Sequence, residues 1–162
     1  MTLSFRGFSA EAMTTYAKEE SKILGSDHWR MMNLFKYFIG DKGSDTWVVV
    51  PLGYLTDGAS VPRIFWNLIP PWGKYGQAAI LHDYLCEFLE VTYLGKPKSI
   101  TRKECDQILL EAMIVLGVPA PTRLTIYAAV SLYRMLSGVS KPTTTKLRRQ
   151  LEAAWLKAQR GN

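Results

Sequence analysis

The chain has 162 residues, of which 48% are hydrophobic and 12% aromatic, with a formal net charge of +6. This is enough apolar surface for a packed core, so the composition excludes a largely disordered chain and favours one compact domain.

The positive charge is concentrated at the C-terminus. From residue 141 onward Glu152 is the single acidic residue, and the basic residues there are Lys141, Lys146, Arg148, Arg149, Lys157 and Arg160. Such a segment is typical of proteins that meet anionic phospholipid surfaces, nucleic acid or acidic polymers, but it is also typical of a solvated helix face. We therefore predict a globular domain over residues 1–140 and a basic amphipathic helix within 141–162.

Cysteine content and hydropathy bear on the compartment. Cys86 and Cys105 are too few for a disulfide framework, although they could form one bridge. The first residues show no apolar run of the signal-peptide type, and no stretch reaches the roughly 18 apolar residues of a membrane span. These features predict a protein kept in a cytoplasm, or released from it by lysis, with reduced thiols.

The N-terminal part predicts a helix followed by two strands. Residues 10–24 are good helix formers ending near Gly25, although Ser9 as N-cap has no Glu or Gln three residues later. Residues 29–39 and 46–50 have strand composition, and the Gly-rich and Asp-rich stretch between them supplies turn residues. We predict an antiparallel hairpin.

The loop from Gly53 to Pro62 is rich in turn residues. Asp57 before Gly58 favours a structural Asx-turn. The same loop could aim carbonyls and the Asp57 carboxylate at a hard cation, or amides at an anion. Tyr54 and Arg63 are the candidate residues for binding a substrate or anion there, and an ordinary salt bridge is the alternative for Arg63.

Residues 74–90 have apolar positions at helical spacing, which predicts a buried helix carrying His82 and Asp83. Adjacent side chains on a helix diverge by about 100°, so these two cannot face the same point. One would face a water or substrate and the other a metal or a loop. The alternative is a buried histidine with satisfied hydrogen bonds and an exposed Asp83.

Three further helices are predicted. Thr101 and Glu104 fit a capping box, so a helix begins there with Asp106 in its first turn, where the helix dipole alone could explain the aspartate. Helices over 121–138 and 145–159 follow, and the second has an apolar stripe suited to a membrane surface, another protein or its own core. The fold class predicted is α+β, mainly α-helical: an N-terminal helix and short antiparallel hairpin, then a bundle of about four helices.

The segments TDGASVPR at 56–63 and LHDYL at 81–85, with the helix from Arg102 to Met113, resemble a family widespread in bacteriophages and prophages that is known as a domain of unknown function. The resemblance covers about residues 48–135. It implies a phage origin, and so a place in the host cytoplasm or the virion, but no activity.

A second resemblance is chemical. In phospholipases A2 a helix with His-Asp-x-Cys-Tyr packs antiparallel to a helix with Cys-Asp or Ala-Asp. The resemblance implies that His82 activates a water, that Asp106 orients His82, and that Asp83 holds calcium with carbonyls of the loop at 54–58. Cys86 and Cys105 resemble the bridge between those helices, with Cys86 one residue late. A neutral His82 would deprotonate the water that attacks an ester, and calcium would polarise the carbonyl.

Three hypotheses follow. The first is a metal-dependent hydrolase using His82, Asp106, Asp83 and Asp57, acting on envelope lipid with Ca²⁺ or on peptidoglycan with Zn²⁺, for which one well-placed histidine is less suitable. The second is a non-enzymatic virion component or host-directed binding protein in which the His–Asp contact is structural. The third is a nucleic-acid binder that uses the C-terminal bases, although no recognised motif is present. The first is preferred.

Overall fold

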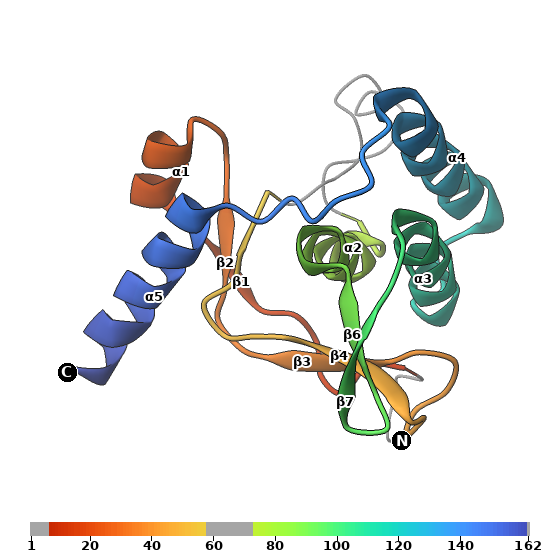
Figure 1. Cartoon of the computed structure of the whole chain (residues 1–162), viewed down its shortest axis with the longest axis horizontal. Coiled ribbons are helices and arrows are strands. Elements are labelled where there is room, and N and C mark those ends of the chain that lie inside the picture. The colour runs from red at the N-terminus through yellow and green to blue at the C-terminus, as the bar shows by residue number, and fades with distance from the viewer. Residues whose placement is uncertain (1–6, 58–72, 162) are drawn as a thin grey trace.

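The computed structural model describes residues 7–57 and 73–161, in which the chain forms an α+β structure with two antiparallel sheets (Figure 1). The helices are α1 (Lys18–Leu24), α2 (Gly76–Phe88), α3 (Arg102–Val115), α4 (Ala120–Ser137) and α5 (Lys146–Arg160). The strands are β1 (Thr14–Tyr16), β2 (Trp29–Met31), β3 (Phe35–Phe38), β4 (Thr46–Val50), β5 (Leu55–Thr56), β6 (Glu90–Tyr93) and β7 (Lys96–Ser99). The predicted fold class is confirmed at this level.

The larger sheet has the strand order β3-β4-β6-β7. Its first two strands form the predicted hairpin, in which Phe35 pairs with Val50 and Tyr37 with Val48. All four side chains are buried, because alternate residues of a strand point to the same face of the sheet. Burial of each such side chain contributes about 1.5–3 kcal/mol, so this inner face is a main source of stability.

Helices α2 and α3 pack side by side, and α4 packs on α3 (Figure 1). The side chains of Leu81 and Leu85 on α2 are fully buried in this core. Helix α3 begins with the predicted capping box, in which the Thr101 hydroxyl accepts a hydrogen bond from the Glu104 amide at 3.2 Å. The cap fixes where α3 starts, and therefore where Asp106 lies.

The smaller sheet has the order β1-β2-β5, and the C-terminal helix α5 lies beside it rather than beside α3 and α4 (Figure 1). The segment before α5 crosses the end of α2, where the Thr144 amide donates to the Glu87 carbonyl at 3.2 Å. At the sheet, Gly53 has φ +85°, and a Cβ there would lie 3.2 Å from the side chain of Leu156. A glycine at this position therefore lets α5 approach the sheet closely.

The N-terminal helix is shorter than predicted. Helix α1 covers only 18–24, and residues 14–16 form β1, which pairs with β2. The β-branched Thr14 and Thr15 favour this pairing, and the imperfect cap at Ser9 gives a helix no start there. The single strand predicted over 29–39 is also two strands, which belong to different sheets. Between these two strands, the Asn33 side chain accepts a hydrogen bond from the Met13 amide and donates one to the Glu11 carbonyl, which holds the N-terminal segment in place.

Two strands were not predicted after α2. The helix predicted over residues 74–90 ends at Phe88, and residues 90–99 form the hairpin β6–β7. Its turn has positive φ at Leu94 (48°) and Gly95 (73°), the geometry of a tight hairpin turn. A hairpin is usually predicted from glycine or asparagine in the turn and from strands without proline. Here a leucine occupies the first turn position and a proline lies within the second strand, so these signals are incomplete. Strand β5 likewise lies where only a loop was predicted.

The predicted bundle of four helices is wrong in one respect, because α5 stands apart from the layer of α2, α3 and α4 (Figure 1). A short helix expected over residues 64–68 lies outside the described residues. Within the ranges that the structure describes, no helix is both long and apolar enough to cross a membrane.

Candidate functional site

The polar residues of α2 divide into two groups that point in different directions. His82 and Cys86 are four residues apart and face α3, whereas Asp83 and Glu87 face β5 and α5. Residues four apart lie on one face of a helix, and adjacent residues do not. The predicted divergence of His82 and Asp83 is therefore observed, and α2 presents two separate buried polar sites.

The first site joins three helices, and we call it the His82 site. His82 Nε2 lies 2.8 Å from Asp106 Oδ1, within the hydrogen-bonding range expected of a catalytic dyad. Arg134 of α4 donates through Nε to Asp106 Oδ2 at 2.7 Å. The side chains of His82 and Asp106 are only 5% and 4% exposed. The pairing of His82 with Asp106, and of the Arg102 guanidinium with the Cys86 carbonyl, shows that α2 and α3 run antiparallel.

These contacts change the protonation of the His82 site. Burial alone would lower the pKa of His82, but the neighbouring Cys86 and Asp106 raise it, to about 9. Burial would raise the pKa of Asp106, but hydrogen bonds from His82 and Arg134 hold it below its ordinary value. At neutral pH the site therefore holds an imidazolium, a carboxylate and a guanidinium.

The two cysteines lie in the His82 site and are both free and buried. Cys86 and Cys105 are hydrogen-bonded to each other, and Cys86 Sγ lies 3.5 Å from His82 Nε2. The bond with Cys105 and burial raise the pKa of the Cys86 thiol above its ordinary value. A protonated thiol is a poor nucleophile, so the arrangement does not suit cysteine–histidine catalysis. The two residues adjoin across α2 and α3 as the phospholipase resemblance implies, without a bridge.

The second site lies between α2, β5 and α5, and we call it the Asp83 site. Asp83 Oδ2 accepts from the Thr56 hydroxyl at 2.8 Å and from the Asp57 amide at 3.3 Å. Arg148 Nη2 lies 3.7 Å from the same oxygen. Asp57 and Asp83, both predicted as metal ligands, are therefore brought together, but an arginine of α5 stands beside them.

One helical turn further along α2, Glu87 binds two arginines of α5. Arg149 Nη2 lies 2.6 Å from Glu87 Oε2, and Arg148 pairs with Oε1. Tyr54, a predicted substrate contact, is 1% exposed and donates its hydroxyl to Glu87 Oε1 at 3.0 Å. Burial and Asp83 raise the pKa of Glu87 to about 7, against the lowering effect of these partners.

Glu152 completes the Asp83 site from α5 itself. Its carboxylate accepts from the Leu55 amide at 2.8 Å and pairs with Arg149 at 3.0 Å. The sequence interpretation gave no role in such a site to Glu87, Arg148, Arg149 or Glu152. One signal for these ion pairs was available in the sequence. Asp83 and Glu87 are spaced to lie on one face of a helix, and two adjacent arginines near the C-terminus could pair with them.

A calcium ion does not fit Asp83 as the described residues are arranged. Calcium needs six to eight oxygen ligands, whereas Asp83 faces an amide, a hydroxyl and a guanidinium. Within residues 7–57 and 73–161, no three or more His, Cys, Asp or Glu side chains are grouped as a metal site. Arg63 lies outside the described residues. Binding of calcium at Asp83 stays a prediction, and it requires that Arg148 move away.

Fold and site together define an α+β protein with a buried His–Asp–Arg contact between antiparallel helices. The family model described as "Protein of unknown function (DUF1353)" matches residues 29–130, and the chain belongs to this family. The matched range contains His82, Asp83, Asp106 and Asp57. The predicted membership of an uncharacterised family is confirmed, whereas phage origin and likeness to phospholipase A2 stay predictions.

One relative with a recorded name is similar over part of the chain. It is the uncharacterized protein y4jT of Sinorhizobium fredii (strain NBRC 101917 / NGR234), which is 36% identical over 86 residues. The match covers 52% of this chain and 23% of y4jT, so the chain corresponds to less than a quarter of that protein. No solved structure matches the chain. Neither name assigns an activity.

Proposed function

We propose that the protein is a hydrolase in which His82, oriented by Asp106, is the general base for a water that attacks an ester of the host cell envelope. The observation that carries the proposal is the 2.8 Å contact between His82 Nε2 and Asp106 Oδ1. It fixes the neutral tautomer with the proton on Nε2, which leaves the lone pair on Nδ1. Among the described residues Nδ1 has only a long contact, 3.9 Å to Cys86 Sγ.

The chemistry expected of the dyad follows from these contacts. Arg134 holds the second oxygen of Asp106, so the carboxylate keeps its orientation while the proton moves. A positioned base of this kind contributes about 10²–10⁴ in rate. Because the pKa of His82 is about 9, only a small fraction is neutral at pH 7, so the rate should rise with pH towards about 9. No step of this mechanism passes through a metal ion.

The setting is part of the same proposal. A phage-encoded protein that acts from the host cytoplasm, or from the virion, would meet the anionic envelope lipids. Arg148 and Arg149 are paired inward, but the other basic residues of the C-terminal segment, Lys141, Lys146, Lys157 and Arg160, are exposed and suit such a surface. Nucleic acid is the less favoured partner, because the sequence has no recognised nucleic-acid-binding motif. Peptidoglycan is the alternative envelope substrate.

A second candidate is favoured by a specific observation. Both members of the dyad are almost fully buried, and both oxygens of Asp106 have protein partners. An imidazolium in such surroundings ties α2, α3 and α4 together without any turnover. The protein would then be a non-enzymatic virion component or a host-directed binding protein.

The two candidates are separated by an assay on anionic phospholipid vesicles and on peptidoglycan, from about pH 6 to about pH 10. For a hydrolase, ester cleavage by the unmodified chain rises with pH, and Asp106→Asn reduces it by about 10²–10⁴ while the variant stays folded by circular dichroism. Lys103→Ala, an exposed change on the same helix, serves as control. Absence of cleavage at every pH on both substrates would leave the structural role.

A further inference from the structure

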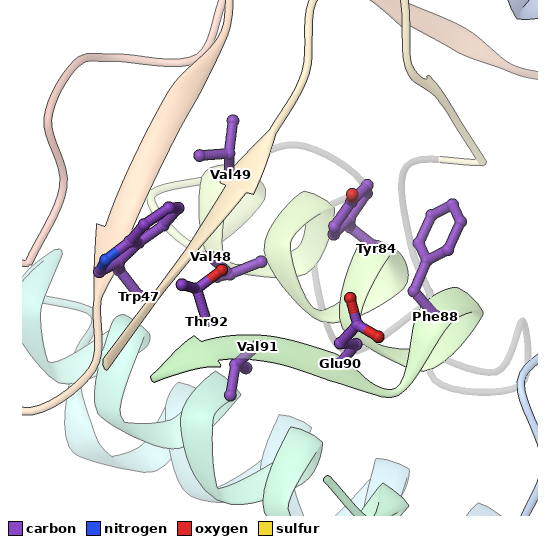
Figure 2. Close-up of a pocket in the computed structure, with 8 residues that line it drawn as sticks. All are labelled: Trp47, Val48, Val49, Tyr84, Phe88, Glu90, Val91 and Thr92. Atoms are coloured by element: carbon purple, nitrogen blue, oxygen red, sulfur yellow. The ribbon is translucent and has the colours of Figure 1, made fainter. Parts of the chain in front are cut away.

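A cavity of about 180 Å³ opens between β4 and β6, away from the His82 site (Figure 2). The two strands pair only at Thr46 with Tyr93 and at Trp47 with Thr92. Beyond these pairs they separate, and the fork is not filled by another strand. The fork creates a concave site on the side of α2 that faces away from α3.

Aromatic rings form two walls of this cavity. Figure 2 shows Trp47 of β4 on one side and Tyr84 and Phe88 of α2 on the other. The rings of Tyr84 and Phe88 pack with centroids 4.6 Å apart. All three side chains are partly exposed, so they remain accessible from the cavity.

The cavity also contains a carboxylate. Glu90 of β6 lines the cavity, and in Figure 2 its side chain stands beside Tyr84 and Phe88, across the cavity from Trp47. The backbone of Glu90 pairs with Ser99 of β7, but its side chain makes no hydrogen bond or ion pair with any residue in the described part of the chain. The faces of aromatic rings are negative, so rings and carboxylate together give the cavity a preference for positive charge.

The same rings already bind cations of the chain. Lys36 Nζ lies 4.1 Å from the centroid of the Trp47 ring, and the Arg149 guanidinium lies 4.8 Å from that of Phe88. A metal ion is a poor candidate, because the cavity offers one carboxylate and not the several oxygens of a cation site. An organic cation does not need several oxygen ligands, because contacts with the faces of aromatic rings can replace the water that it loses on binding.

We infer that this cavity binds an organic ammonium group, held by Trp47, Tyr84 and Phe88 through cation–π contacts and by Glu90 through an ion pair. Its volume is below the roughly 300–1,000 Å³ of sites for drug-sized molecules, so it suits the small charged end of a ligand. That end is a quaternary or primary ammonium. The inference does not rest on the proposed hydrolase activity.

The test is a titration of the full chain with choline, followed by the nuclear magnetic resonance signals of the Trp47 indole and the Thr92 amide. Choline should shift both signals with a millimolar dissociation constant. Its uncharged analogue, in which carbon replaces the nitrogen, should bind about fivefold more weakly or not at all. Phosphocholine and butylammonium then identify which molecule carries the ammonium group. Tighter binding of phosphocholine indicates a lipid headgroup, and tighter binding of butylammonium indicates a primary amine.

Two variants complete the test. Glu90→Gln should weaken choline binding about fivefold to tenfold, whereas Glu19→Gln, an exposed carboxylate on α1, should leave it unchanged. Lys36→Met removes the competing ammonium beside Trp47 and should strengthen binding. The inference is overturned if choline shifts neither signal up to about 100 mM. Equal binding of the uncharged analogue, or unchanged binding by Glu90→Gln, would overturn it as well.

Discussion

His82 and Asp83 are neighbours in the sequence, but they lie in buried sites of different construction. The His82 site has one histidine, one carboxylate and one arginine, and both oxygens of Asp106 are bonded. The Asp83 site has three carboxylates and two arginines crowded between α2, β5 and α5. Within the described residues, Nε of both Arg148 and Arg149 has no hydrogen-bond partner.

The comparison shows two ways of burying charge. The His82 site joins three helices, and the side chains of its His82 and Asp106 are only 5% and 4% exposed, whereas that of Arg134 is 24% exposed. The Asp83 site depends on a C-terminal helix that is tied to α2 by ion pairs, and the side chains of Arg148 and Arg149 are 12% and 28% exposed. Loss of the carboxylate should therefore cost more in the first site, because the His82 imidazolium left there cannot turn outward.

The largest effect is expected for Asp106→Ala. It leaves a buried imidazolium and the Arg134 guanidinium without their carboxylate, and should lower the free energy of unfolding by about 3–5 kcal/mol. Denaturant unfolding followed by circular dichroism measures this, with Lys103→Ala as control on the same helix. A loss below about 1 kcal/mol would show that the site is not closed.

The pH dependence of stability sharpens the same point. The pKa of His82 is raised from 6.5 to about 9 in the folded chain. The stabilisation that protonated His82 adds to the free energy of unfolding is therefore fully present below about pH 6.5 and is lost as pH rises through about 9. The contribution is on the order of 3 kcal/mol. Unfolding curves across this range should show the loss in the unmodified chain and not in His82→Gln. A flat difference between them would contradict the assigned pKa.

In the Asp83 site, Glu87→Ala should lower the free energy of unfolding by about 2 kcal/mol. This is less than the change at Asp106, because the charged side chains left behind, those of Arg148 and Arg149, are 12% and 28% exposed, whereas that of His82 is 5% exposed. The variant should also loosen α5, so a protease should cleave the segment 138–145 faster. Glu104→Gln, away from α5, controls for a general loss of stability. Unchanged cleavage would mean that other contacts hold the helix.

The smallest effect concerns calcium. In calorimetric titrations the unmodified chain should bind calcium weakly, since Arg148 stands beside Asp83. Arg148→Gln should bind it about tenfold more tightly by removing that charge, and Asp83→Asn in the same background should lose the gain. Zinc, titrated in parallel, should show no such dependence. Tight calcium binding by the unmodified chain would show that the guanidinium is no obstacle.

Part of this structure could be predicted from sequence. The capping box at Thr101 predicted the start of α3, and the apolar spacing of α2 predicted its buried face. The contact between His82 and Asp106 was expected from the resemblance to phospholipases A2 and not from these patterns. Arg134 could not be assigned, because α4 exposes large apolar side chains, including Leu132 and Leu136, and its pattern does not define one inner face.

The inward orientation of the arginines of α5 could not be predicted for a different reason. Hydrophobic periodicity places charged residues on the outer face of a helix. In α5 the pairing with Asp83 and Glu87 turns Arg148 and Arg149 inward instead. This depends on carboxylates about 60 residues earlier in the chain, and no local pattern of α5 contains that information.

Strand β7 has a consequence for behaviour at high concentration. It is one of the two edge strands of the larger sheet, it is exposed along its whole length, and its sequence is Lys-Pro-Lys-Ser. Proline lacks the amide that an added strand would need, and two lysines repel a second copy of the same edge. The composition that hid this strand from prediction therefore protects the sheet against edge-to-edge aggregation.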